Sequence, residues 1–254
     1  MYRFYGWEKA DILDRNGLNP RDLYDLLSGI WCAETCAPRM RDQWTPENPT
    51  YGQCSITAFL VQDLFGGRVY GVPRKDGSFH CFNAVEDCVF DLTSEQFGDE
   101  ALNYEGCPEQ LREVHFAREE KRQRYLTLRK RLLAEYAVRL KHSGFNCCQA
   151  VLCAFPGNVD LALLRRVGAG FGVGMGGMEA TCGAICGAQI LLGLNQYAGK
   201  PILREARALQ QAFQDRCGAT VCKDLKGVNS GVVLCECDDC VRNAVIALEE
   251  QLQG

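Results

Sequence analysis

The chain has 254 residues, a formal net charge of -4 at pH 7 and 16 cysteines. A chain of this length buries an adequate core without disulfide staples, so the cysteines need another explanation. The acidic balance and the lack of a dominant basic tract exclude a general nucleic-acid binder. Because histidine occurs only as His80, His115 and His142, any multi-metal chemistry must use thiolate or carboxylate ligands.

The start of the chain lacks the apolar core of a signal peptide, and no apolar run is as long as a membrane span. We therefore expect a cytoplasmic protein with no membrane or nucleic-acid partner. In a reducing compartment, cysteines at this density indicate metal ligands, catalytic thiols or transient redox pairs rather than structural disulfides.

The first part of the chain predicts a mixture of helices and strands. Asn19-Pro20 starts a helix over residues 20–35, and a second helix begins at Cys54 and ends at Gly66-Gly67. Three short β-rich segments follow over residues 68–74, 78–85 and 88–93, separated by turn residues, which predicts an antiparallel meander. The first helix is expected to bury Leu23, Leu26, Leu27, Ile30 and Trp31.

The second part predicts only helices. Residues 108–140 read as one charged connecting helix whose basic run lies on a solvated face. About five helices follow, without a convincing strand. We predict an α+β fold: a papain-like domain over residues 1–107, a connecting helix over 108–142, and an all-helical cysteine-rich bundle over 143–254. The buried stripe of the connecting helix is expected to contain Tyr125, Leu128, Leu132, Tyr136 and Leu140.

A glycine-rich stretch over residues 168–193 organises the cysteine-rich part. Gly174, Gly176 and Gly177 allow positive φ or a close approach of the backbone to a cofactor or a helix. A dinucleotide site is less favoured, because the segment before these glycines reads as a helix rather than a strand. The following helix, capped by Thr181, is expected to place Cys182 and Cys186 on one face.

The order Cys54, His80, Asp91 is a candidate nucleophilic site. A helix N-terminus and a nearby imidazole both lower a thiol pKa, and Cys54 can have both. His80 would act as the general base and Asp91 would orient it. Asn83 could replace Asp91, and Gln53 or backbone N–H groups could bind an oxyanion. The alternative is a buried small cysteine beside an ordinary strand histidine.

The run WTPENPTYGQCSITAFLVQDLFGG, followed by FHCFNAV and FDLTSEQF, resembles the YunG-like family over about residues 20 to 106. These small bacterial proteins are regarded as papain-like or transglutaminase-like in a wide sense. The resemblance implies Cys54, His80 and Asp91 as the triad, with Gln96 as a further motif residue and a peptide or amide bond as the default substrate.

Cys147, Cys182, Cys222 and Cys240 lie far apart in the sequence and are not the two CxxC knuckles of a zinc ribbon, but a bundle can still bring four thiolates to one metal or cluster. Cys147 and Cys182 follow cap-type residues and are candidates for reactive thiolates. Cys148, Cys153 and Cys186 are explained as small core residues. The segment CECDDC, with Cys235, Cys237 and Cys240, could equally hold a redox or metal pair.

Residues from about Ser143 to Leu252 resemble the redox-active C-GCAxxG-C-C family through GFNCCQAVL, GFGVGMGGMEATCGAICGAQILLGL, CKDLKG and CVRNAVIALEE. The family motif is written GCA, whereas this chain has Cys182-Gly183-Ala184. Extra thiols mean that the ligand set could differ, and these are Cys148, Cys217, Cys235 and Cys237. The resemblance implies electron transfer or an iron-sulfur cluster, with these signature ligands: Cys147, Cys182, Cys222 and Cys240.

We therefore expect a cysteine hydrolase-type module joined to a redox module that binds an iron-sulfur cluster. The alternatives are a non-catalytic thiol/disulfide protein in which Cys54 is structural, and a protein with zinc on the cysteines. A redox partner protein would suit the second module. Gly183 and Gly187 permit close helix pairing, either within one chain or across a homodimer.

Overall fold

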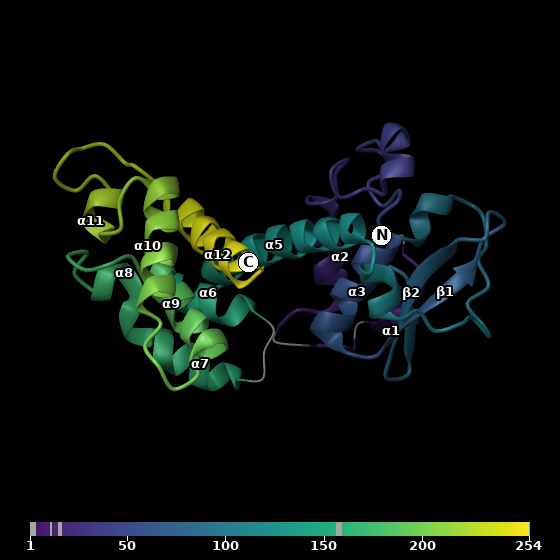
Figure 1. The fold of residues 1–254 in the computed structure, drawn as a ribbon, viewed down its shortest axis with the longest axis horizontal. Helices are drawn as coiled ribbons and strands as arrows, with labels where there is room; N and C mark the ends of the chain where they lie inside the picture. Colours follow the sequence, from purple (N-terminus) through teal and green to yellow (C-terminus); the bar gives the residue numbers. More distant parts are fainter. Residues whose placement is uncertain (1–3, 11, 15–16, 156–158, 254) are drawn as a thin grey trace. The chain divides into compact units, whose positions relative to one another are not determined.

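The computed structural model describes residues 4–10, 12–14, 17–155 and 159–253 and divides into two compact units, Met1–Leu132 and Leu133–Gly254. The division falls within the long helix α5, Glu119–His142 (Figure 1). None of the helices in the described ranges is both long and apolar enough to cross a bilayer. The two units are described separately below.

Unit 1 packs a helix against a small antiparallel sheet. The sheet has the order β1-β2-β3, with Gly71 opposite Cys81 and Asn83 opposite Phe90. This meander confirms the predicted α+β class. The elements before α5 are α1 Trp7–Ala10, α2 Pro20–Ser28, η1 Pro38–Gln43, α3 Cys54–Phe65, β1 Arg68–Pro73, β2 Phe79–Val85, β3 Cys88–Phe90, η2 Ser94–Phe97 and α4 Arg112–Phe116.

The first helix is shorter than predicted. The Asn19 side chain caps α2 as expected, but Gly29 ends the helix after Ser28. Leu23, Leu27, Ile30 and Trp31 are buried as predicted, whereas Leu26 is half-buried, and the residues beyond Gly29 form a separate turn. In that turn the carbonyl of Cys32 accepts the N–H of Cys36 at 3.0 Å. Gly29 has an ordinary right-handed conformation, with φ of -87°, and the apolar spacing did not reveal that the helix ends here.

The connecting segment is two helices rather than one, because α4 ends at Phe116 and α5 begins at Glu119. All five residues of the predicted stripe are buried. The basic run of α5 is not entirely solvated: the guanidinium of Arg124 is only 6% exposed and donates to Thr35 O at 2.9 Å and to Gly52 O at 3.1 Å. This part of α5 therefore belongs to the core of unit 1.

Unit 2 is helical, as predicted; Asn146 and Asp160 cap α6 and α7, and Gly218 ends α10. The predicted cap at Thr181 is wrong, because Cys182 is the N-cap of α9. The elements are α6 Cys147–Ala154, α7 Leu161–Gly168, η3 Ala169–Phe171, α8 Gly172–Met175, α9 Gly183–Gln196, α10 Leu203–Cys217, α11 Cys222–Leu225 and α12 Cys237–Gln253.

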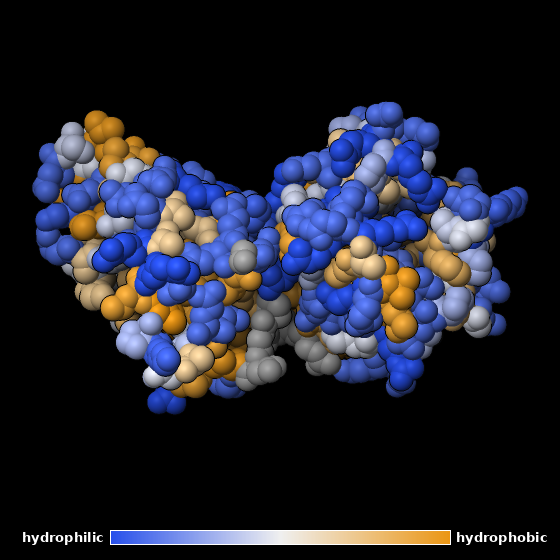
Figure 2. All heavy atoms as spheres, viewed as in Figure 1, coloured by the Kyte–Doolittle hydropathy of each residue, from blue (hydrophilic) through white to orange (hydrophobic). Residues whose placement is uncertain are grey.

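The loop that follows α11 carries exposed aliphatic side chains. Figure 2 shows hydrophobic residues gathered over this loop, at the upper left of the view. Val228, Val232, Val233 and Leu234 are between 47% and 61% exposed. The loop leads directly to the buried Cys235, so an apolar surface borders the cysteine-rich region of unit 2.

Two glycines bring α9 close to α6. A Cβ placed on Gly187 would lie 2.8 Å from the carbonyl oxygen of Cys148, and one on Gly183 would lie 2.7 Å from Cys147 Sγ. Real side chains do not tolerate such distances, so a larger residue would push the helices apart.

We expect Gly187→Ala to lower the free energy of unfolding of unit 2 by about 1–3 kcal/mol, because it overpacks the contact between α6 and α9. Gly193→Ala is the matched control, since a Cβ there has no neighbour within 4 Å. The control should be neutral or stabilising by about 0.5–1 kcal/mol because alanine favours a helix. Urea unfolding of both variants measures the difference, and equal midpoints would contradict the close packing.

Candidate functional site

Cys54 is the first residue of α3, and His80 lies on β2. His80 Nε2 lies 2.5 Å from Asp91 Oδ2, just beyond the end of β3. His80 and Asp91 are 2% and 1% exposed, whereas Cys54 is half-buried. The structure therefore brings the predicted base and its orienting carboxylate together.

Asp91 is held in place by more than the imidazole. Its Oδ1 accepts the backbone N–H and the hydroxyl of Thr93, at 3.0 and 3.1 Å, and its Oδ2 also accepts the Tyr104 hydroxyl at 3.0 Å. Burial of a carboxylate is costly unless hydrogen bonds satisfy it, and these bonds do so. The predicted alternative, Asn83, points elsewhere and donates to Ala58 O at 2.9 Å.

The remaining ring nitrogen of His80, Nδ1, is buried and has no hydrogen-bond partner among the described residues. Burial opposes a charge on His80, but the charge and hydrogen bond of Asp91, together with Cys54, raise its pKa to about 10. The Asp91 bond assigns Nε2 as a donor, which leaves Nδ1 as the nitrogen able to exchange a proton with Cys54.

Cys54 has an acidic thiol. The neighbouring thiol of Cys81 contributes most to lowering the pKa of Cys54 well below its usual value; burial opposes this, and His80 and the backbone N–H of Cys81 add to it. The same contact raises the pKa of Cys81 well above its usual value. The pKa shifts of Cys54 and His80 both favour a thiolate at Cys54 beside an imidazolium at His80. Sequence reasoning missed Cys81, although it is adjacent to His80 in the chain.

The turn before Cys54 is fixed by buried bonds. Gln53 is fully buried and donates to Cys32 O at 3.0 Å, so its side chain supports the turn and cannot reach a substrate oxyanion. The motif residue Gln96 accepts the N–H of Gly52 at 3.5 Å and donates to Thr93 O at 2.7 Å. The backbone N–H groups at the start of α3 remain as candidate oxyanion donors.

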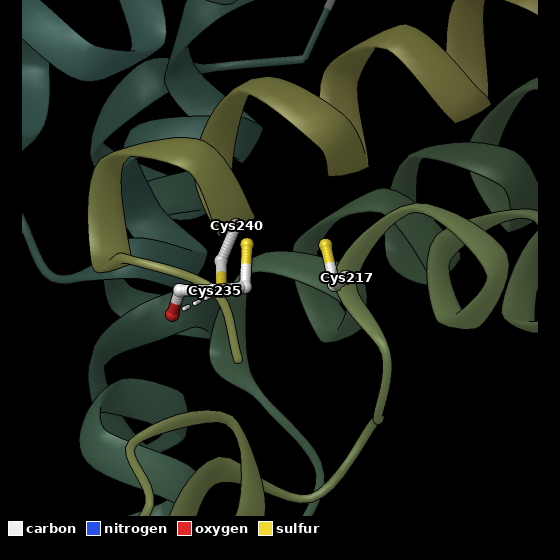
Figure 3. A group of neighbouring side chains, drawn as sticks. All are labelled: Cys217, Cys235 and Cys240. Carbon is white, nitrogen blue, oxygen red and sulfur yellow. Dashed lines mark hydrogen bonds between the residues drawn. The ribbon is translucent and has the colours of Figure 1, made fainter. Parts of the chain in front are cut away.

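Three buried thiols of unit 2 form a second group. The sulfur atoms of Cys217, Cys235 and Cys240 all lie within 4.8 Å of one another. Cys217 ends α10, Cys235 precedes α12 and Cys240 lies in its first turn (Figure 3). Lys226 Nζ lies 2.6 Å from Cys235 O and 3.9 Å from Cys240 Sγ, which places a positive charge beside the sulfurs. This cysteine cluster can hold a metal ion.

The four signature cysteines are only partly gathered. Cys240 belongs to the cluster of three, and the thiols of Cys182 and Cys147 continue from it, because Cys182 interacts with both Cys240 and Cys147. The Cys222 thiol interacts electrostatically with Cys147, and a backbone bridge between Thr181 and Val221 joins the segments that carry Cys182 and Cys222. Of the extra thiols noted in the sequence, Cys217 and Cys235 complete the closest group.

The expectation of reactive thiolates at Cys147 and Cys182 is not met. Interaction with the Cys182 thiol, followed by burial, raises the pKa of Cys147 well above its usual value. Cys147 lowers the pKa of Cys182, but Cys240 and burial outweigh it and raise the value to about 12. A helix N-terminus therefore does not offset the effect of crowding and desolvation on the pKa of either thiol.

The glycine-rich loop approaches the signature thiols through a left-handed turn. The φ angles of Val173, Gly174, Met175 and Gly176 are 52°, 53°, 57° and 87°. A Cβ on Gly174 would lie 2.6 Å from Cys222 Cβ, whereas one on Gly177 would meet nothing within 4 Å. Of the three candidate cofactor glycines, Gly174 is thus the one that permits a close approach, and its neighbour is a cysteine.

We expect Asp91→Asn to raise the pH at which Cys54 becomes reactive. A lowered pKa keeps the thiol ionised as the pH falls, so wild-type Cys54 should react with iodoacetamide nearly as fast at pH 7 as at pH 9. Loss of the Asp91 charge lowers the pKa of His80 and should slow the reaction at pH 7 by at least roughly tenfold. Mass spectrometry of the tryptic peptide over residues 42–68, whose one cysteine is Cys54, gives the rate.

The control for this measurement is Asp76→Asn, which removes an exposed carboxylate that pairs with Arg39. It should leave the pH profile of Cys54 unchanged. Identical profiles for Asp91→Asn and wild type would show that Asp91 does not support the thiolate.

Comparisons with known proteins divide the chain in the same order. Residues 19–137 match the family described as "YunG protein", and residues 145–251 match the one described as "Putative redox-active protein (C_GCAxxG_C_C)". "Uncharacterized protein YunG" of Bacillus subtilis (strain 168) is 37% identical over 84 residues, which cover 33% of this chain and 71% of that protein. No solved structure matches the chain at a significant level. The chain thus belongs to the YunG family, and the region after the YunG part matches the C-GCAxxG-C-C family.

Proposed function

We propose that unit 1 is a cysteine hydrolase-type module acting on amide or peptide bonds. The observation that carries this proposal is the 2.5 Å bond between His80 and Asp91, which leaves His80 Nδ1 for the acidic thiol of Cys54. The Cys54 thiolate attacks the carbonyl carbon, and the His80 imidazolium protonates the departing amine. His80 then takes a proton from the water that hydrolyses the thioester.

Turnover of dipeptidyl aminomethylcoumarin amides and of p-nitrophenyl acetate tests this proposal. Cys54→Ala should abolish release of the fluorophore and of nitrophenol, whereas Cys107→Ala, a half-buried thiol elsewhere in unit 1, should retain both. Asp91→Asn should reduce kcat/KM by roughly 10²-fold or more, because it removes the group that orients the imidazole. Full activity of Cys54→Ala would refute the proposal.

For unit 2 we propose a redox role in which its thiols bind an iron-sulfur cluster that supplies one-electron transfer. Soft thiolate donors, a buried setting and the positive charge of Lys226 support a metal centre here. The matching family is described as redox-active, which supports iron over a redox-inert metal. By the signature, the ligands would be Cys147, Cys182, Cys222 and Cys240.

A single zinc ion is the second candidate, and one observation favours it. Tetrahedral zinc with Zn–S bonds of about 2.3 Å spaces its sulfurs about 3.8 Å apart. The three sulfurs of Cys217, Cys235 and Cys240, within 4.8 Å of one another, suit such an ion with little movement. The two candidates differ in ligands, since Cys217 and Cys235 are not signature residues and Cys147 is not in the group of three.

Metal and acid-labile sulfide analysis of protein purified without oxygen separates the two. Iron with sulfide and a visible absorption band, lost in Cys147→Ser and kept in the core control Cys153→Ala, is expected for a cluster on the signature cysteines. Zinc lost in Cys217→Ser but kept in Cys147→Ser would assign the single-ion site instead. Protein with neither metal would refute both.

A further inference from the structure

Cys32 and Cys36 lie in one turn of unit 1, between α2 and η1, and neither belongs to the site described above. The carbonyl of Cys32 accepts the backbone N–H of Cys36 at 3.0 Å, so the two residues are one helical turn apart. Their Cα atoms are then about 6 Å apart, which lies within the range of disulfides.

Cys32 is a half-buried thiol in contact with a cation. Arg131 Nη1 lies 2.8 Å from Cys32 Sγ, and the same guanidinium is paired with the carboxylate of Glu34. The Thr35 hydroxyl lies 3.8 Å from the sulfur. Partial burial raises the pKa of Cys32, but the bonds from Thr35 and the charge of Arg131 outweigh it and lower the pKa. Cys32 is therefore accessible and readily ionised, as a peroxide-sensitive thiol must be.

Cys36 has the opposite character. It is fully buried, its Sγ donates to Ala37 O at 3.6 Å, and burial raises its pKa, so it keeps its proton. Cys36 lies one turn from Cys32, in position to resolve an oxidised Cys32 sulfur, and it gives up its proton as its sulfur attacks.

We propose that Cys32 and Cys36 form a peroxide-sensitive pair whose disulfide reshapes the turn that presents Cys54. The Cys32 thiolate attacks hydrogen peroxide, the O–O bond breaks, and sulfenic acid and hydroxide form. The Cys36 sulfur then displaces the sulfenic oxygen, and its proton leaves with that oxygen as water. The two thiols together lose two electrons, which reduce one peroxide to the level of water.

The disulfide would disturb contacts with the Cys54 turn. Helical residues four apart have Cβ atoms about 5–6 Å apart, wider than a disulfide allows, so the backbone of the turn must move. Gln53 donates to Cys32 O at 3.0 Å, and Ala37 N donates to Gly52 O at 3.0 Å. A Cβ on Gly52 would lie 2.6 Å from Cys36 Sγ, so the turns are in direct contact. Movement of the oxidised turn is therefore transmitted to Gln53, the residue before the nucleophile.

The tryptic peptide over residues 22–39 contains Cys32 and Cys36 and no other cysteine, which allows a direct test on the full chain. The reduced protein is treated with hydrogen peroxide, alkylated and digested. We expect this peptide to lose the mass of two hydrogen atoms and to escape alkylation, with reversal by dithiothreitol. In Cys36→Ser the pair cannot close, and dimedone should label Cys32 as sulfenic acid.

Arg131→Gln tests the role of the cation. Oxidation of the peptide should slow by roughly tenfold, because a rise of one unit in the pKa of Cys32 lowers the thiolate fraction that much. Arg122→Gln on the same helix, where Arg122 pairs with exposed Glu119, is the matched control and should oxidise like wild type. Equal rates in wild type and Arg131→Gln would overturn the assignment of Arg131.

The effect of the disulfide on Cys54 is measured as the rate of alkylation of Cys54 rather than as hydrolysis of a substrate. This proposal therefore does not depend on the proposed hydrolase function. Among molecules whose 42–68 peptide has not gained oxygen, the alkylation rate of Cys54 should fall by roughly tenfold in the oxidised protein, but not in peroxide-treated Cys36→Ser. Cys54→Ala should still form the Cys32–Cys36 disulfide. The proposal would be overturned if the 22–39 peptide stayed reduced after peroxide or became cross-linked to the 42–68 peptide. An unchanged alkylation rate of Cys54 in the oxidised protein would also overturn it.

Discussion

The buried hydrogen bond between His80 and Asp91 is the constraint on which unit 1 depends. A carboxylate that is 1% exposed has to be paired, and Asp91 is paired with the imidazole on one oxygen and with Thr93 on the other. These bonds join β2 to the segment after β3 and fix which ring nitrogen of His80 remains available. The charge held there then favours the imidazolium, and the imidazolium favours the thiolate of Cys54.

A second buried charge, Arg124, organises the turns around the nucleophile. Its guanidinium donates hydrogen bonds to the carbonyls of Thr35 and Gly52. Thr35 lies in the turn that contains Cys32, and Gly52 lies in the turn before Cys54. Buried carbonyls need such donors, and a helix that brings one cation to two turns makes their positions interdependent. A covalent change that moves one turn therefore moves the other turn as well.

In unit 2 the governing physics is the crowding of thiols. Contacts between thiols, together with burial, raise the pKa values of Cys240, Cys182 and Cys147 on balance, although Cys182 lowers that of Cys240 and Cys147 lowers that of Cys182. Gly174 and Gly183 leave space for the side chains of Cys222 and Cys147, because a Cβ on Gly174 would lie too close to Cys222 and one on Gly183 too close to Cys147. The left-handed turn at Val173 and Met175 has a steric cost that the loop's close approach to these thiols offsets.

The sequence by itself determined the α+β class, the antiparallel meander and the helical second half, because apolar period, capping residues and glycine stops are local signals. It also named Cys54, His80 and Asp91, whose order along a helix and two adjacent strands implies proximity. Only the tertiary structure placed Cys81 beside Cys54, buried Arg124 out of a basic run, and gathered Cys217 and Cys235 with Cys240. Those contacts depend on how distant helices and turns pack, and on the desolvation that packing causes, which no residue spacing encodes.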